Sequence, residues 1–160
     1  MCIRDRVSCL AGASGLAGMA GGQMLDLQAE QTRFSLDQTT QMQAMKTGAL
    51  IRAATVMGGI AGGASETMIS ALADYADAIG LAFQLADDLL DYQAESTELG
   101  KPAGRDAEAG KASYVHFYGV EGTREKAEAL VEVAAKALAP FAKDAEPLLE
   151  LAQFSINRTH

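Results

Sequence analysis

The chain has 160 residues, enough for one domain with a buried core, and its formal net charge is −8. No run of lysine or arginine forms a basic face, so nucleic acid is excluded as a general partner. With only two cysteines and two histidines, we expect neither a disulfide framework nor a zinc site, and we expect a reduced, cytoplasmic setting. Small anions stay compatible with this acidity, because metal ions or a few lysines can reverse the local charge.

Apolar residues recur at helical spacing through most of the chain, and no period-two alternation is long enough for a strand. We therefore predict an all-α fold in one domain, residues 1–160. The predicted helices cover, in chain order, 8–32, 38–61, 65–92, 111–118, 122–140 and 144–157.

The N-terminal segment allows more than one interpretation. Val7 to Leu25 carries no charge, which is also true of signal peptides and short membrane spans. Most of its residues are glycine, alanine and serine, whose transfer into lipid gains little free energy. We therefore predict a buried helix packed through small residues, with no stable membrane insertion. Met1 to Arg6 lacks helical periodicity and is a candidate for a non-native leader.

Two glycine-containing segments separate the later helices. Gly58-Gly59 and Gly62-Gly63 precede Ser65, and this order predicts the end of one helix and an N-cap for the next. The segment from Glu95 to Gly110 combines several glycines with a proline, so it is predicted to form a mobile loop.

Three carboxylates end the helix predicted at 65–92. Asp87, Asp88 and Asp91 place two of them four residues apart on one face, about 6 Å apart at Cβ. They repel each other and the negative end of the helix dipole, and a divalent cation would turn both penalties into attraction. The alternative is a solvated acidic helix end. Surrounding leucines, and Gln84 one turn earlier on the same face, favour a pocket wall instead.

The sequence resembles the trans-prenyl diphosphate synthases, the family that contains farnesyl and geranylgeranyl diphosphate synthases. Matching motifs stand in the family's order and spacing at Gly21 to Leu27, Lys46 to Ile51, Phe83 to Asp91, Leu99 to Asp106 and Gly110-Lys111. They cover the chain from about Leu10 onward. The resemblance implies the isoprenoid synthase helical bundle, with this chain as its C-terminal portion.

The resemblance also implies a metal site. Asp87, supported by Asp88 and Asp91, would hold a Mg²⁺ that bridges to the diphosphate of an allylic substrate. Asp26 would be an outer partner of that metal.

Further residues would contact the substrates. Lys46 and Lys101 would hold the same diphosphate, with the hydroxyl of Thr47 as an additional donor. Gln23 and Gln84 would line the reaction cavity. Lys111 and Arg158 are lesser candidates, for loop closure and for contacts of the C-terminal tail respectively.

The reaction that the resemblance implies is head-to-tail prenyl transfer between isopentenyl diphosphate and an allylic diphosphate, without a protein nucleophile. The family also has a first DDxxD and basic residues for isopentenyl diphosphate, and this sequence has neither. We therefore expect a fragment of a larger synthase domain, inactive alone, that associates through apolar faces of the helices at 8–32 and 65–92. The full-length enzyme is expected to be a homodimer. Product length is set near the missing motif and does not follow from this sequence.

Two other functions stay open. A class I terpene cyclase shares the fold and one DDxxD, but pairs it with an Asn/Ser/Glu motif in place of the elements at Lys46 and Lys111. A non-catalytic subunit of a heteromeric prenyl synthase would be free to lose its aspartates, and here all three are retained. Ser113 and Val115 depart from the threonine and proline that are usual in the family.

Overall fold

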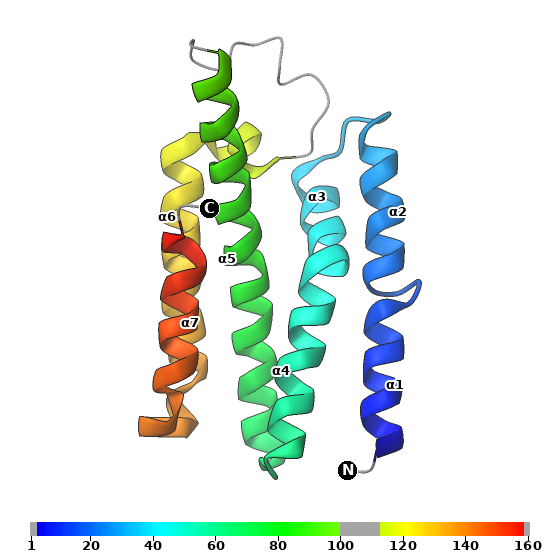
Figure 1. The fold of residues 1–160 in the computed structure, drawn as a ribbon, viewed down its shortest axis with the longest axis vertical. Coiled ribbons are helices and arrows are strands. Elements are labelled where there is room, and N and C mark those ends of the chain that lie inside the picture. Colours follow the sequence, from blue (N-terminus) through cyan, green and yellow to red (C-terminus); the bar gives the residue numbers. More distant parts are fainter. Residues whose placement is uncertain (1–2, 100–112, 159–160) are drawn as a thin grey trace.

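The structure is a computed structural model that describes residues 3–99 and 113–158, and the side chains of 95–99 lie outside that description. Within these ranges every element is a helix, which confirms the predicted all-α class (Figure 1). The elements are α1 (Ile3–Ser14), α2 (Met19–Ala29), α3 (Leu36–Gln43), the π-helix η1 (Ala44–Gly48), α4 (Ala49–Ala61), α5 (Glu66–Leu99), α6 (Tyr114–Ala137), the 3-10 helix η2 (Ala139–Ala145) and α7 (Glu146–Asn157).

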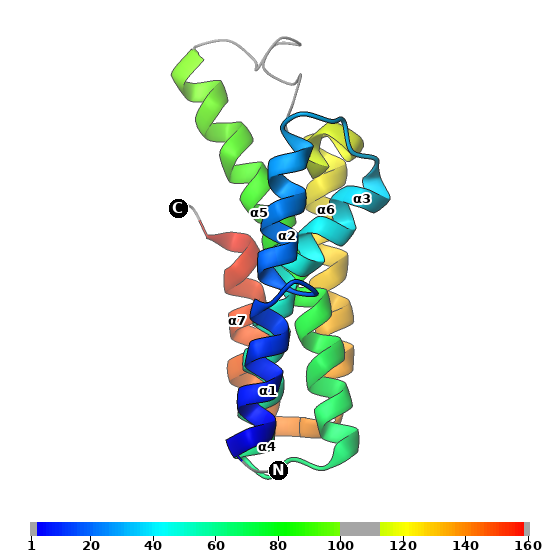
Figure 2. The same cartoon turned by 90° about the vertical axis from the view of Figure 1, so that its right-hand side faces the viewer.

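The long helix α5 runs through the middle of the bundle (Figure 1). α6 and α7 pack against one side of it, and α3, η1 and α4 form a continuous rod against the other. α1 and α2 follow each other along the outer side of that rod, α1 on α4 and α2 on η1. Figure 2 views the bundle from their side, where the two helices form one column.

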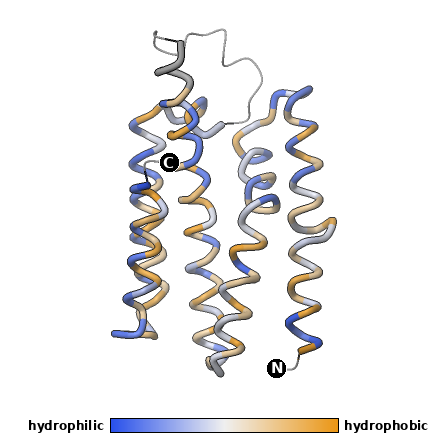
Figure 3. Tube along the Cα trace, in the orientation of Figure 1, coloured by the Kyte–Doolittle hydropathy of each residue, from blue (hydrophilic) through white to orange (hydrophobic). Residues whose placement is uncertain are grey.

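The core lies where α5 meets α6 and α7. Alanines at 76, 82, 134 and 152 are completely buried there, and their small side chains allow the helices to approach closely at little cost in side-chain entropy. Tyr75 is buried among them, and its hydroxyl donates to the carbonyl of Leu148 at 2.8 Å. Hydrophobic and hydrophilic residues alternate along the helices (Figure 3), as amphipathic packing requires.

Several predicted boundaries differ from the structure. The predicted helix at 8–32 is two helices, because the glycine-rich segment between Ser14 and Met19 forms turns in place of helix. Residues 95–99 continue α5, so the predicted loop does not begin at Glu95. The break predicted at 119–121 is confirmed, because Gly119 interrupts the helical geometry inside α6, with φ at 69° and ψ at 174°.

The N-terminal segment is helical but not buried. α1 begins at Ile3 and has no buried residue, and α2 buries only Gly22 and Ala29. The prediction of a buried helix over 8–32 is therefore wrong, because α1 and α2 lie at the outer edge of the bundle (Figure 2), and the helix begins before its predicted start although Met1 to Arg6 lacks helical periodicity. Large apolar side chains are exposed on both helices and on the turn between them, namely Ile3, Val7, Leu10, Leu16, Met19, Met24 and Leu27.

The described part of α5 exposes no large apolar side chain. The expected exposed apolar face is therefore present on α1 and α2 but not on the helix predicted at 65–92, which α4, α6 and α7 cover. No helix among the described residues is both long enough and apolar enough to cross a bilayer.

Candidate functional site

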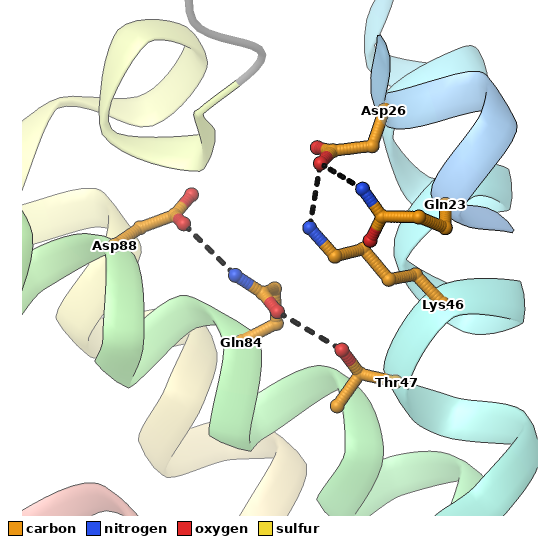
Figure 4. Close-up of polar contacts among 6 residues, drawn as sticks. All are labelled: Gln23, Asp26, Lys46, Thr47, Gln84 and Asp88. Carbon is orange, nitrogen blue, oxygen red and sulfur yellow. Dashed lines mark hydrogen bonds and ion pairs between the residues drawn. The ribbon is translucent and has the colours of Figure 1, made fainter. Parts of the chain in front are cut away.

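Lys46 and Thr47 lie in the π-helical turn η1, between α2 and α5. Turns of this kind often occur at functional sites. The Nζ atom of Lys46 is 2.6 Å from Oδ2 of Asp26 on α2. The hydroxyl of Thr47 donates to Oε1 of Gln84 on α5 at 3.4 Å. Two consecutive residues therefore connect η1 to the helices on its two sides (Figure 4).

The α2 side of the site consists of Gln23, Asp26 and Lys46. Gln23 donates through Nε2 to the same Asp26 oxygen that holds Lys46, at 3.4 Å. The side chains of Lys46 and Asp26 are 32% and 31% exposed, so the ion pair is open to solvent and to a ligand. The predicted place of Asp26 beside a metal stays a prediction, and in the structure its carboxylate orients Lys46.

The α5 side of the site centres on Asp88. Gln84 donates through Nε2 to Oδ1 of Asp88 at 3.1 Å, and the backbone N–H of Tyr114 donates to Oδ2 at 2.6 Å. Burial raises the pKa of Asp88 above its ordinary value, although hydrogen bonds from Tyr114, Gln84 and Ser113 act in the opposite direction. The charged carboxylate therefore still carries a desolvation penalty, which a bound cation would offset.

Asp87 forms an ion pair with Arg158 at the end of α7. Nη2 of Arg158 lies 2.7 Å from Oδ1 of Asp87. The guanidinium carbon also lies 3.9 Å from the ring centroid of Phe83. The sequence suggested tail contacts for Arg158 without a partner, and no local pattern could have identified one 71 residues away.

The structure describes some of the remaining predicted site residues and not others. Asp91 lies one turn after Asp87 on α5. Lys101 and Lys111 fall outside the described residues. No pattern in the sequence indicated the hydrogen bond from the Tyr114 backbone to Asp88, which depends on how the start of α6 docks against α5.

The carboxylates suit a hard cation. Among the described residues, no group of three His, Cys, Asp or Glu side chains is arranged to hold a metal ion. Mg²⁺ in phosphate-binding enzymes commonly takes only one or two carboxylates, with water and substrate phosphate oxygens completing its octahedron. Asp87 and Asp88 carry carboxylate oxygens of the kind that Mg²⁺ takes, so these residue types are compatible with a magnesium ion.

Comparison with known proteins identifies the family. A family model described as polyprenyl synthetase matches residues 10–146. Farnesyl diphosphate synthase of Escherichia coli strain K12 is 43% identical, over 97% of this chain and 54% of its own length. A dimethylallyltranstransferase of Fischerella ambigua strain UTEX 1903 is also 43% identical, over 94% of this chain and 44% of its own length.

Solved structures agree with these relatives. The apo structure of an FPP/GFPP synthase from Zymomonas mobilis matches with a TM-score of 0.80 and 36% identity, over 95% of this chain and 50% of its own. Helicobacter pylori geranyltransferase complexed with magnesium and isoprenyl diphosphate matches with a TM-score of 0.72 and 31% identity, over 96% and 50%. The chain spans about half the length of these relatives. It has the isoprenoid synthase helical fold and belongs to the polyprenyl synthetase family.

Proposed function

We propose that this chain supplies the second aspartate-rich site of a prenyltransferase that joins isopentenyl diphosphate head to tail to an allylic diphosphate. One observation carries the proposal: the polar groups of α2, η1 and α5 point toward one another. Lys46, which is paired with Asp26, faces the hydrogen bonds that connect Thr47, Gln84 and Asp88 (Figure 4). A cation, a hydroxyl group and half-buried carboxylates thus lie together, a combination that suits a metal-bound diphosphate.

Each residue has a role in this proposal. Asp87 and Asp88 would hold magnesium, with Asp91 beside them. Magnesium, when bound, would neutralise the charge that develops on the departing diphosphate. Lys46 supplies a compact positive charge to the same diphosphate, and Thr47 supplies a hydroxyl donor. Lys46 is already oriented before any substrate arrives, because Asp26 holds it, whereas the single hydroxyl hydrogen of Thr47 would pass from Gln84 to the diphosphate.

The family resemblance supports further parts of the proposal. Lys101 would be a second lysine on the diphosphate, and Lys111 would act in loop closure. Gln23 would line the cavity together with Gln84. The chain would form one helical domain with the remainder of a larger synthase, working as a cytoplasmic homodimer. Since the sequence contains one DDxxD where the family's cavity has two, we propose negligible turnover for the chain alone.

Calorimetric titration tests the site. We expect dimethylallyl diphosphate to bind the chain only when Mg²⁺ is present. Lys46→Met and the pair Asp87→Asn with Asp88→Asn should each lower the affinity about tenfold or more, since each removes a charge-assisted contact. Lys136→Met on the exposed side of α6 is the matched control and should leave the affinity unchanged. Equal affinities for the carboxamide variant and the unmodified chain would exclude a metal site at these aspartates.

A chimaera tests the reaction. This chain is substituted for the matching segment of the Escherichia coli farnesyl diphosphate synthase, to which it is 43% identical. We expect the chimaera to form a longer prenyl product and Asp87→Asn with Asp88→Asn to abolish that activity. The isolated chain, given the same two diphosphates and Mg²⁺, should form none. A chimaera that stays active after both substitutions would contradict the proposed role of the motif.

A further inference from the structure

Two glycines lie at the contacts between η1 and the helices on either side. A Cβ atom added to Gly22 of α2 would lie 2.2 Å from the backbone nitrogen of Lys46 and 2.6 Å from its Cα. A Cβ atom added to Gly80 of α5 would lie 3.1 Å from the Cα of Gly48. The first distance is shorter than real Cβ contacts, so an alanine at position 22 must push α2 and η1 apart. An alanine at position 80 requires the neighbouring Gly48 backbone to shift by only a few tenths of an ångström.

Each glycine lies one turn before a polar residue of the site. Gly22 precedes Asp26 by four residues on α2, and Gly80 precedes Gln84 by four on α5. Residues at this spacing share one face of a helix. The close backbone contact therefore sets how far each polar side chain lies from η1.

The π-helical turn makes such contacts necessary. A π turn closes hydrogen bonds between residues five apart, one more than an α-helix, so extra backbone must fit between the neighbouring helices. Neighbours without side chains at the contact points leave the space for it.

We propose that Gly22 and Gly80 are positioning residues that set how deeply η1 sits between α2 and α5. Gly22 thereby holds Lys46 against Asp26, and Gly80 holds Thr47 against Gln84. Only the consequence for diphosphate binding rests on the proposed function. The packing itself involves no ligand.

The first test is therefore made without ligand, on the full chain, by urea unfolding. The coupling between Lys46→Met and Asp26→Asn, and that between Thr47→Val and Gln84→Met, is measured by double-mutant cycles. In the unmodified chain we expect couplings of about two- to fivefold in the unfolding equilibrium constant. Gly22→Ala should abolish the first coupling and Gly80→Ala the second.

Two further variants sharpen this test. Gly58→Ala is the matched control, because a Cβ atom there meets nothing within 4 Å, and both couplings should survive it. Asp26→Glu in the Gly22→Ala chain should restore a coupling with residue 46, since one more methylene carries the carboxylate back toward the lysine. A purely general destabilisation by Gly22→Ala would not be rescued in this way.

The inference is overturned if a folded Gly22→Ala chain retains the coupling of Lys46 with Asp26, or if Gly80→Ala retains that of Thr47 with Gln84. If Gly22→Ala prevents folding, the Gly80→Ala chain, which needs the smaller shift, tests the inference by itself.

Titration with inorganic diphosphate and Mg²⁺ then separates the inference from the proposed function. If the positioning role and the proposed function both hold, Gly22→Ala lowers the affinity for diphosphate about tenfold, and adding Lys46→Met lowers it no further. If the couplings change as expected while every variant binds diphosphate equally, the proposed function fails and the positioning role stands.

Discussion

Arg158 holds Asp87 across the bundle, with 2.7 Å between Nη2 and Oδ1. The pair joins the end of α7 to the aspartate motif of α5, residues that are 71 positions apart in the sequence. The guanidinium lies over the ring of Phe83, so the contact combines an ion pair with a cation–π interaction. It holds the end of α7 beside the proposed magnesium site.

We predict a measurable coupling between Arg158 and Asp87. The Arg158 side chain is 16% exposed and that of Asp87 is 48% exposed, so solvent screens the pair in part and we expect about 0.5 to 1 kcal/mol. A double-mutant cycle with Arg158→Ala and Asp87→Asn, followed by urea unfolding, measures it. The control is the pair Arg52–Asp77, whose side chains are 52% and 60% exposed. Its coupling should be smaller, and an equal or larger value there would contradict the prediction.

Tyr75 should make the chain less stable in alkali. Burial raises its pKa above the ordinary value of 10.0. Above that pH the unfolded chain has lost the phenolic proton while the folded chain still holds it, so the free energy of unfolding falls until the pH passes the raised pKa. Tyr75→Phe should cost about 1 kcal/mol at neutral pH, through the lost hydrogen bond to Leu148. The unfolding free energy of the Tyr75→Phe chain should then decline less steeply above pH 10 than that of the unmodified chain. Urea unfolding at a series of pH values measures both, and an equal decline in the two chains would refute the prediction.

Gly119 should resist replacement because of its backbone conformation. With φ at 69° and ψ at 174°, it occupies a region that is essentially restricted to glycine. A Cβ atom there would meet nothing within 4 Å, so a clash with neighbours plays no part. Gly119→Ala should lower the free energy of unfolding by about 1 to 3 kcal/mol. Gly58→Ala, at a helical position in open space, should raise it by up to about 1 kcal/mol. Equal changes in the free energy of unfolding at the two sites would contradict the predicted cost of a side chain at Gly119.

The exposed apolar side chains of α1, of α2 and of the turn between them should cause self-association. Leu16 is 88% exposed and Met24 57%, and apolar surface of this kind promotes association in water. In sedimentation velocity, we expect the chain to form oligomers whose fraction rises with concentration. Leu16→Ser with Met24→Ser should reduce that fraction. Val133→Ser on α6, which removes one exposed apolar side chain elsewhere, should not, and an equal effect of both changes would point to a different surface.

Much of the helical layout could be predicted from the sequence, because helical periodicity and glycine breaks are local properties. The end of α4 near Gly62 and the start of α5 at Glu66 are examples. The break predicted at 119–121 is another, since Gly119 there has non-helical φ and ψ values. Local rules failed at α1, whose small residues indicated burial although the helix has no buried residue.

The residue types of the site follow from the sequence by itself: aspartates spaced one turn apart on a helix, a Lys-Thr pair and glutamines nearby. Their partners follow only from the tertiary structure. Lys46 on Asp26, Arg158 on Asp87 and the Tyr114 backbone on Asp88 all join different helices. A periodic pattern shows which residues share a helix face, but not which two faces meet or how closely. That distance depends on side-chain volume at the contact, and around η1 it depends on the missing side chains of Gly22 and Gly80.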